Sequence, residues 1–156
     1  MKYEKFYSIS YKINDLLSEY ITVHNNVLAK KILLREIIPI PFIFKPIDFS
    51  FYVSKLDKVI EELAEILNEL KAYCKANELE NHNFYITASR YVNLLLKSII
   101  SLRNIQNKLY DKSQGNALYS YKEYKKELDL YKLDTMNYCE FGTDFNKAFY
   151  DLRREL

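Results

Sequence analysis

Apolar side chains recur at helical spacing along the first quarter of the chain, with polar side chains between them. Two neighbouring rows repeat every seven residues: Phe6, Ile13, Tyr20, Val27, Leu34 and, beside them, Ile9, Leu16, Val23, Ile37, with Lys30 as the one defect of the second row. An apolar seam over four heptads predicts one long helix over residues 4–38. Pro39 sets its end, because the residue before a proline is disfavoured in the α region.

Three more segments show the same amphipathic pattern. They predict helices over residues 54–80, 84–111 and 118–156. Ser54 and Asp57 have the spacing of a capping box, with Asp in place of Glu, at the start of the second helix. In the last segment the apolar period continues through Gly142 without a shift, so we expect one helix with a weak point at that glycine.

Four amphipathic helices joined by short turns predict an all-α fold, an antiparallel up-down bundle that forms a single domain over 1–156. The connection between the first two helices is the exception, because residues 39–53 form a long apolar loop that contains all three prolines of the chain. The 15 tyrosines and 9 phenylalanines fall mostly near the two ends of such a bundle. We expect these rings to plug its ends, with Leu, Ile and Val filling the middle.

The proline-containing loop is the first candidate site. Its candidate protein-binding residues are large apolar side chains: Ile40, Phe42, Phe44, Phe49 and Phe51. Folded back over the bundle they would form a lid, with room for a small apolar ligand beneath it. Turned outward they would form a docking surface for a partner protein. Insertion into a membrane surface is a third alternative, which the scarcity of nearby basic residues disfavours.

A basic helical face is the second candidate site. Residues 81–112 carry five basic side chains and one acidic one, whereas residues 54–80 carry four basic and seven acidic ones. The candidate phosphate-contact residues lie on the third helix: Arg90, Asn93, Lys97, Arg103, Asn104 and Lys108. They either flank the acidic second helix as solvated partner charges or follow a nucleic-acid backbone. The stretch 119–126 interleaves tyrosines with lysines and would add base stacking to the second alternative.

Residues that carry chemistry are scarce. The two histidines, His24 and His82, lack the spacing of zinc or di-iron ligands, and two isolated glycines do not make a phosphate-cradling loop. We therefore expect no catalytic, cofactor-binding or metal-binding residues, and no enzymatic activity. His24 is expected to be a partly buried, hydrogen-bonded structural residue, and His82 a solvent-exposed residue of a turn.

The composition narrows the cellular compartments and the classes of partner that fit the sequence. The net charge of +2 is too small to indicate nucleic acid by itself. The longest uncharged apolar run, 37–44, is far shorter than the roughly 20 residues of a membrane span. Two cysteines, Cys74 and Cys139, are expected to be reduced and packed, as in a cytoplasmic protein. High Lys, Asn, Ile and Tyr content is typical of AT-rich microbial or viral genomes.

These patterns favour a non-enzymatic intracellular protein–protein interaction protein: an adaptor, an inhibitor or a small subunit of a larger assembly. Self-association through the loop would be one form of this function. One alternative is a nucleic-acid-backbone-binding helical subunit that uses the basic face of the third helix. A further alternative is the binding of a small apolar ligand under loop 39–53.

Overall fold

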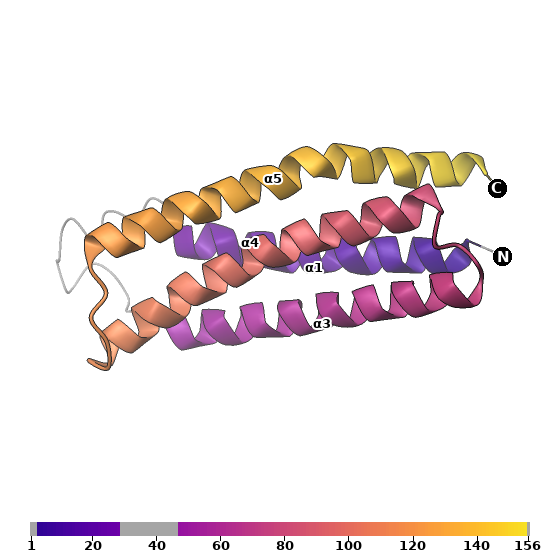
Figure 1. Cartoon of the computed structure of the whole chain (residues 1–156). Coiled ribbons are helices and arrows are strands. Elements are labelled where there is room, and N and C mark those ends of the chain that lie inside the picture. Colours follow the sequence, from indigo (N-terminus) through magenta and orange to yellow (C-terminus); the bar gives the residue numbers. More distant parts are fainter. Residues whose placement is uncertain (1–2, 29–46, 156) are drawn as a thin grey trace.

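Four long helices build the part of the chain that the computed structural model describes, residues 3–28 and 47–155. They are α1 (Glu4–Leu28), α3 (Phe49–Ala76), α4 (Asn83–Ser113) and α5 (Tyr121–Arg154), shown in Figure 1. Within these ranges there is no strand. The predicted all-α class and the four-helix bundle are confirmed.

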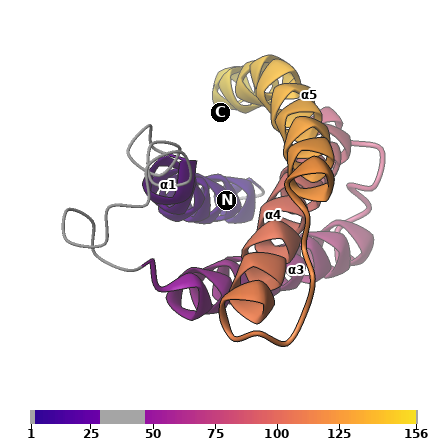
Figure 2. The ribbon, with the colours of Figure 1, turned by 90° about the vertical axis from the view of Figure 1, so that its left-hand side faces the viewer.

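The helices pack in chain order, α1 against α3, α3 against α4 and α4 against α5, and α1 also touches α4 across the core. Figure 2 shows this arrangement from one end of the bundle. The ring of Phe6, at the start of α1, lies 4.7 Å from that of Phe84, at the start of α4, and 5.8 Å from that of Tyr73, near the end of α3. Figure 1 accordingly shows the chain reversing direction from helix to helix.

Burial follows the sequence pattern of α1. Its predicted rows are buried throughout the described helix: Phe6, Ile9, Ile13, Leu16, Tyr20, Val23 and Val27. Leu34 and Ile37, which continue these rows in the sequence, lie outside the described residues. The buried residues of α1 form one core cluster with the buried faces of the other helices. Apolar burial of this kind contributes roughly 25 cal/mol per Å² and is the main stabilising term.

The predicted start of the second helix was wrong. α3 begins at Phe49 rather than after Ser54, so residues 49–53 are helical and not part of a loop. Asp48 is the N-cap, and its side chain accepts a hydrogen bond from the backbone N–H of Phe51 at 3.0 Å. An aspartate two residues after Pro46 is itself a helix-start signal, which the aromatic character of 49–53 obscured. At the other end α3 stops at Ala76, short of the predicted residue 80.

The boundaries of α4 and α5 lie close to prediction, whereas the predicted end of the first helix, at residue 38, lies outside the described residues. His82 is the N-cap of α4, and its Nδ1 accepts from the N–H of Phe84 at 3.1 Å. Its side chain is only 16% exposed and packs on the Phe6 ring, so the prediction of a solvent-exposed turn residue was wrong. α5 starts at Tyr121, three residues later than predicted, because Ser120 forms the capping box with Glu123. The helix passes Gly142 without a break.

Aromatic rings fill the middle of the bundle as well as its ends, which corrects the expected separation. Tyr20, Tyr131, Tyr91 and Tyr138 are all buried. The rings of Tyr20 and Tyr138 lie 6.1 Å apart and those of Tyr91 and Tyr138 6.3 Å apart. In the described chain, the backbones of α1 and α5 approach each other closely at few places. Large rings therefore span the distance between these two helices.

Candidate functional site

Only part of the predicted loop site lies in the described residues. Ile40, Phe42 and Phe44 lie outside them, whereas Phe49 and Phe51 belong to the first turn of α3. The Phe51 side chain is 51% exposed, and its ring lies 5.4 Å from that of Tyr52 in an edge-on arrangement. The Lys55 ammonium lies 5.5 Å from the centre of the Phe51 ring. One large aromatic side chain of the predicted set is therefore open to solvent.

A cavity of about 210 Å³ lies beside Phe51, between α1 and α3. Its apolar lining consists of Val23, Phe51, Tyr52 and Val59. Its polar lining consists of Glu19, Thr22, Asn26 and Lys55. Because Phe51 is half exposed, the cavity adjoins an apolar side chain that a partner could cover.

The same two helices enclose a second hollow of about 540 Å³, which shares Glu19 with the cavity. Five carboxylates line it: Asp15, Glu19, Glu62, Glu65 and Glu69. Glu69 pairs with Lys5 and Lys12, and Glu62 with Lys58. The other three carboxylates form no ion pair within the described ranges. We call the cavity and this hollow together the α1–α3 groove; it is apolar at one end and acidic along the rest.

The predicted basic face of α4 is engaged by neighbouring helices. Lys97 pairs with Asp134 of α5 at 3.0 Å, and Arg103 with Asp57 of α3 at 2.8 Å. Lys108 pairs with Glu127 of α5. The remaining members also have protein partners or polar surroundings. The Arg90 guanidinium lies 4.6 Å from the centre of the Phe141 ring; Asn93 donates to the Ser89 carbonyl; Asn104 lines a shallow hollow between α4 and α5.

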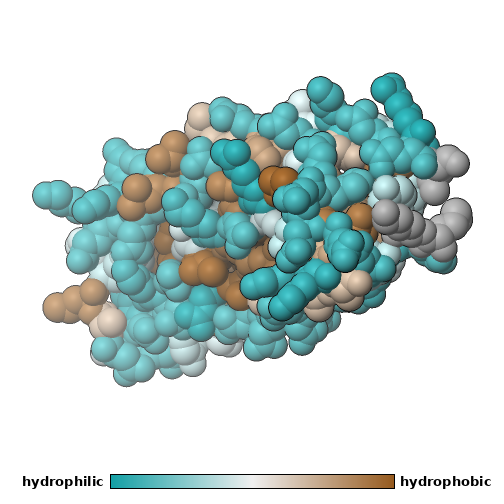
Figure 3. Space-filling view, turned by 45° about the vertical axis from the view of Figure 1, so that its right-hand side comes forward, coloured by the Kyte–Doolittle hydropathy of each residue, from teal (hydrophilic) through white to brown (hydrophobic). Residues whose placement is uncertain are grey.

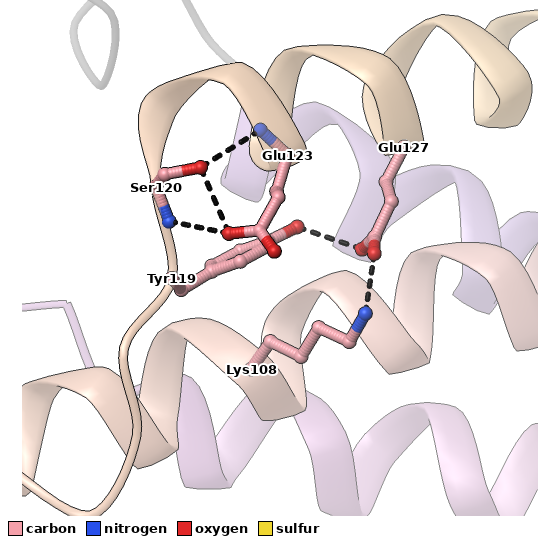
Figure 4. Close-up of polar contacts among 5 residues, drawn as sticks. All are labelled: Lys108, Tyr119, Ser120, Glu123 and Glu127. Atoms are coloured by element: carbon pink, nitrogen blue, oxygen red, sulfur yellow. Dashed lines mark hydrogen bonds and ion pairs between the residues drawn. The ribbon is translucent and has the colours of Figure 1, made fainter.

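The first turns of α5 carry a different set of charges. Lys122, Lys125 and Lys126 are exposed, and none forms an ion pair in the part of the chain that the structure describes. Glu123 is held by the capping box, and Glu127 by Lys108 and the hydroxyl of Tyr119, as Figure 4 shows. We call Lys122, Lys125 and Lys126 the lysine cluster. The ammonium groups of the cluster form no ion pair with Glu123 or Glu127, whose carboxylates bond other residues.

A polar network runs through the centre of the bundle. The Tyr131 hydroxyl lies 2.6 Å from the Tyr20 hydroxyl and 2.5 Å from His24 Nδ1. Tyr20 bonds in turn to Ser98 of α4, which reaches Thr135 of α5 at 3.1 Å. Burial lowers the pKa of His24 and raises the pKa values of Tyr20 and Tyr131. All of these groups are therefore neutral near pH 7, which suits a structural network.

His24 is half buried and hydrogen-bonded, as predicted. Both cysteines are free; Cys74 is buried, whereas Cys139 is exposed, so the expectation that both thiols pack inside was wrong for Cys139. Burial raises the pKa of the Cys74 thiol to about 11, which keeps it protonated and unreactive. No group of three metal-ligating side chains gathers among the described residues.

Sequence reasoning missed two features of the surface. The α1–α3 groove is lined by residues of two helices, so the sequence pattern of either helix alone shows only part of the lining. The acidic residues of the second helix were its visible signal, but they were interpreted as partners of the basic face. The lysine cluster was visible as interleaved tyrosines and lysines. The two glutamates beside these lysines, Glu123 and Glu127, bond other residues.

Comparisons with other proteins add no family assignment. No protein-family model, no curated protein and no solved structure matches this chain. A functional assignment therefore rests on the geometry and the charges of the molecule's own surface.

Proposed function

We propose that this protein is a non-enzymatic protein–protein interaction protein that binds a basic amphipathic segment of its partner in the α1–α3 groove. The observation that carries the proposal is half-exposed Phe51 beside an apolar cavity that leads into a row of carboxylates. An amphipathic helix laid along this groove would bury an apolar anchor against Phe51 and place cationic side chains beside Glu19 and Glu65. The protein would act as an adaptor, an inhibitor or a small subunit.

The charge of the groove supports a basic partner. Asp15, Glu19 and Glu65 lack ion-pair partners in the described chain, so a cationic segment would not have to displace existing pairs. Charges of one sign along a groove also speed the encounter with an oppositely charged partner. The free thiols of Cys74 and Cys139 suit a reducing compartment, so we place the protein in the cytoplasm.

The size of the cavity bears on the small-ligand alternative. Small-molecule sites have volumes of roughly 300–1,000 Å³, whereas the apolar cavity beside Phe51 measures about 210 Å³. A space of this size suits a single inserted side chain of a protein better than a separate ligand. The binding of a small apolar ligand is therefore the weaker alternative.

The nucleic-acid alternative would require the basic face of α4 to exchange partners. A phosphate at Lys97, Arg103 or Lys108 would have to compete with a carboxylate already within ion-pair distance. If that face nevertheless binds nucleic acid, Lys97→Glu combined with Lys108→Glu should abolish a salt-sensitive gel shift. The absence of any shift for the wild type at low salt would exclude this alternative.

The groove is tested with two designed peptides of about 18 residues, roughly five helical turns. One is an amphipathic Leu/Lys helix, and the other carries Glu in place of Lys. Fluorescence anisotropy should show salt-sensitive binding of the Leu/Lys peptide only. Phe51→Ser, and separately Glu19→Lys with Glu65→Lys, should each weaken binding at least about tenfold, the effect of losing an interface anchor.

The matched control changes the same charge elsewhere. Glu140→Lys with Asp144→Lys alters exposed residues of α5 and should leave peptide affinity within about twofold of the wild type. Circular dichroism should show unchanged helix content in every variant. Equal binding of both peptides, or an affinity that is insensitive to Phe51→Ser, would contradict the proposed groove.

A further inference from the structure

The connection between α4 and α5 exposes more apolar surface than a turn needs. Leu118 is fully exposed, and Tyr121, at the start of α5, is 71% exposed. Leu130, two turns further along α5, is 54% exposed. The space-filling view of Figure 3 shows separate brown, hydrophobic patches on a mainly hydrophilic surface. This end of the bundle, where α3 also begins, further carries half-exposed Phe51.

The exposed position of Leu118 is fixed by its neighbours. Tyr119 is buried, and its hydroxyl donates to Glu127 at 2.7 Å. The Lys108 ammonium binds the same carboxylate, so Tyr119 is tied to both α4 and α5. Ser120 forms the capping box with Glu123 (Figure 4). Leu118 thus precedes two anchored residues and is held away from the core.

The lysine cluster stands beside this apolar surface. Lys122, Lys125 and Lys126 follow helical steps of three and four residues, and Leu130 continues the same face. The third nearby carboxylate, Asp129, lies 3.7 Å from the Lys132 ammonium. The three lysines and Leu130, with Asp129, line one shallow hollow of the surface.

We propose that this corner binds the surface of an anionic lipid bilayer. Leu118 and Tyr121 would insert at the level of the headgroups, where a leucine loses contact with water and a tyrosine keeps its hydroxyl hydrated. The lysine cluster would lie against the lipid phosphates and carboxylates. None of the described helices is long and apolar enough to cross a bilayer, so the attachment is peripheral.

Nucleic acid is the competing anion, and the apolar side chains favour lipid. A single strand is bound by aromatic stacking and cations, and neither use requires Leu118 or Leu130. Tyr121 is the one exposed ring next to the cluster in the described chain. A bilayer uses all of these side chains together.

The test is co-sedimentation of the full chain with vesicles of phosphatidylcholine alone and of phosphatidylcholine with phosphatidylserine at about 7:3. Binding is expected only with phosphatidylserine and should weaken as salt is raised. Lys122→Glu, Lys125→Glu and Lys126→Glu together should reduce partitioning at least about 100-fold, since each lysine contributes about fivefold. Leu118→Ser should reduce it about tenfold, the effect of burying one leucine.

The matched control reverses three exposed lysines at the other end of the bundle, Lys71, Lys75 and Lys147, and should stay within about threefold of the wild type. An equal loss of partitioning in this control would show that binding depends only on the net charge of the protein, and would overturn the proposal. So would binding to phosphatidylcholine alone, or no effect of Leu118→Ser. A fluorescent oligothymidine of about 20 nucleotides that binds through the lysines but not through Leu118 would assign the corner to nucleic acid instead.

Discussion

The helix pairs α4–α5 and α1–α3 differ in how far the charged side chains along their interfaces are paired. Between α4 and α5, Lys97 and Lys108 each reach a carboxylate of the facing helix, and Asp134 is only 7% exposed. Between α1 and α3, several carboxylates line an open groove, and three of them have no cationic partner in the described chain. The first pair joins its charges across the helix interface, whereas the second leaves three carboxylates without an ion pair among the described residues.

This difference shows that a count of charges along a helix does not locate a binding surface. α4 has the highest excess of basic residues among the four helices, yet three of its cations are engaged by acids of α3 and α5. Unpaired charges of one sign gather instead in the α1–α3 groove and in the lysine cluster. Partners of either sign are therefore expected at those places rather than on α4.

The largest effect on stability is expected in the polar network at the centre of the bundle. Tyr131→Phe removes the hydroxyl that joins Tyr20 to His24, and leaves the Tyr20 hydroxyl and the His24 ring each without one partner. We expect a loss of about 1–3 kcal/mol in the free energy of unfolding, measured by urea denaturation. Tyr150→Phe, at an exposed ring, should change it by less than about 0.5 kcal/mol. Equal values for the two variants would show that the network does not stabilise the fold.

A smaller loss is expected from the α4–α5 ion pair. Asp134→Ala deprives Lys97 and the Ser101 hydroxyl of their acceptor. The cost should be about 1–2 kcal/mol, because the Lys97 ammonium can return to water while Ser101 is partly buried. Thermal unfolding of Asp134→Ala beside exposed Asp144→Ala measures the difference. A melting temperature for Asp134→Ala as high as that of the control would place Asp134 with the surface charges that contribute nothing to stability.

Low pH should weaken the polar network at the centre of the bundle, because His24 becomes protonated. Burial lowers the pKa of His24 in the folded protein below its ordinary value of 6.5. The unfolded chain therefore binds the proton more readily, and the stability from neutral His24 is present above pH 6.5 and is lost as the pH falls below it. The slope of unfolding free energy between about pH 7 and 5 should be shallower in His24→Gln than in the wild type. Parallel slopes would contradict this assignment.

The smallest effect on stability is expected in the α1–α3 groove. Glu65→Gln removes one exposed, unpaired carboxylate from a row of like charges. The free energy of unfolding should change by less than about 0.5 kcal/mol, and relief of repulsion would make the change favourable. Equilibrium denaturation at low salt checks this. A loss of more than about 1 kcal/mol would mean that Glu65 has a structural partner and is not available for binding.

Helical periodicity predicted much of the fold and little of the surface. The heptad rows of α1 are buried as predicted, and Gly142 lies in a continuous helix. The prediction failed at Asp48, where a cap signal stood next to aromatic residues that resembled a loop. For Tyr20 and Tyr131 the period correctly placed both rings in the core, but it could not pair their hydroxyl groups.

The sequence by itself determined the helices of this protein and the faces that they bury. Helical periodicity is a local property, since residues three and four apart share a face whatever surrounds them. Only the tertiary structure decided which charges are free. An ion pair depends on side chains distant in sequence, as Lys97 and Asp134 are, and a groove exists only between two packed helices. The candidate sites therefore follow from the packing of α1 on α3 and of α4 on α5.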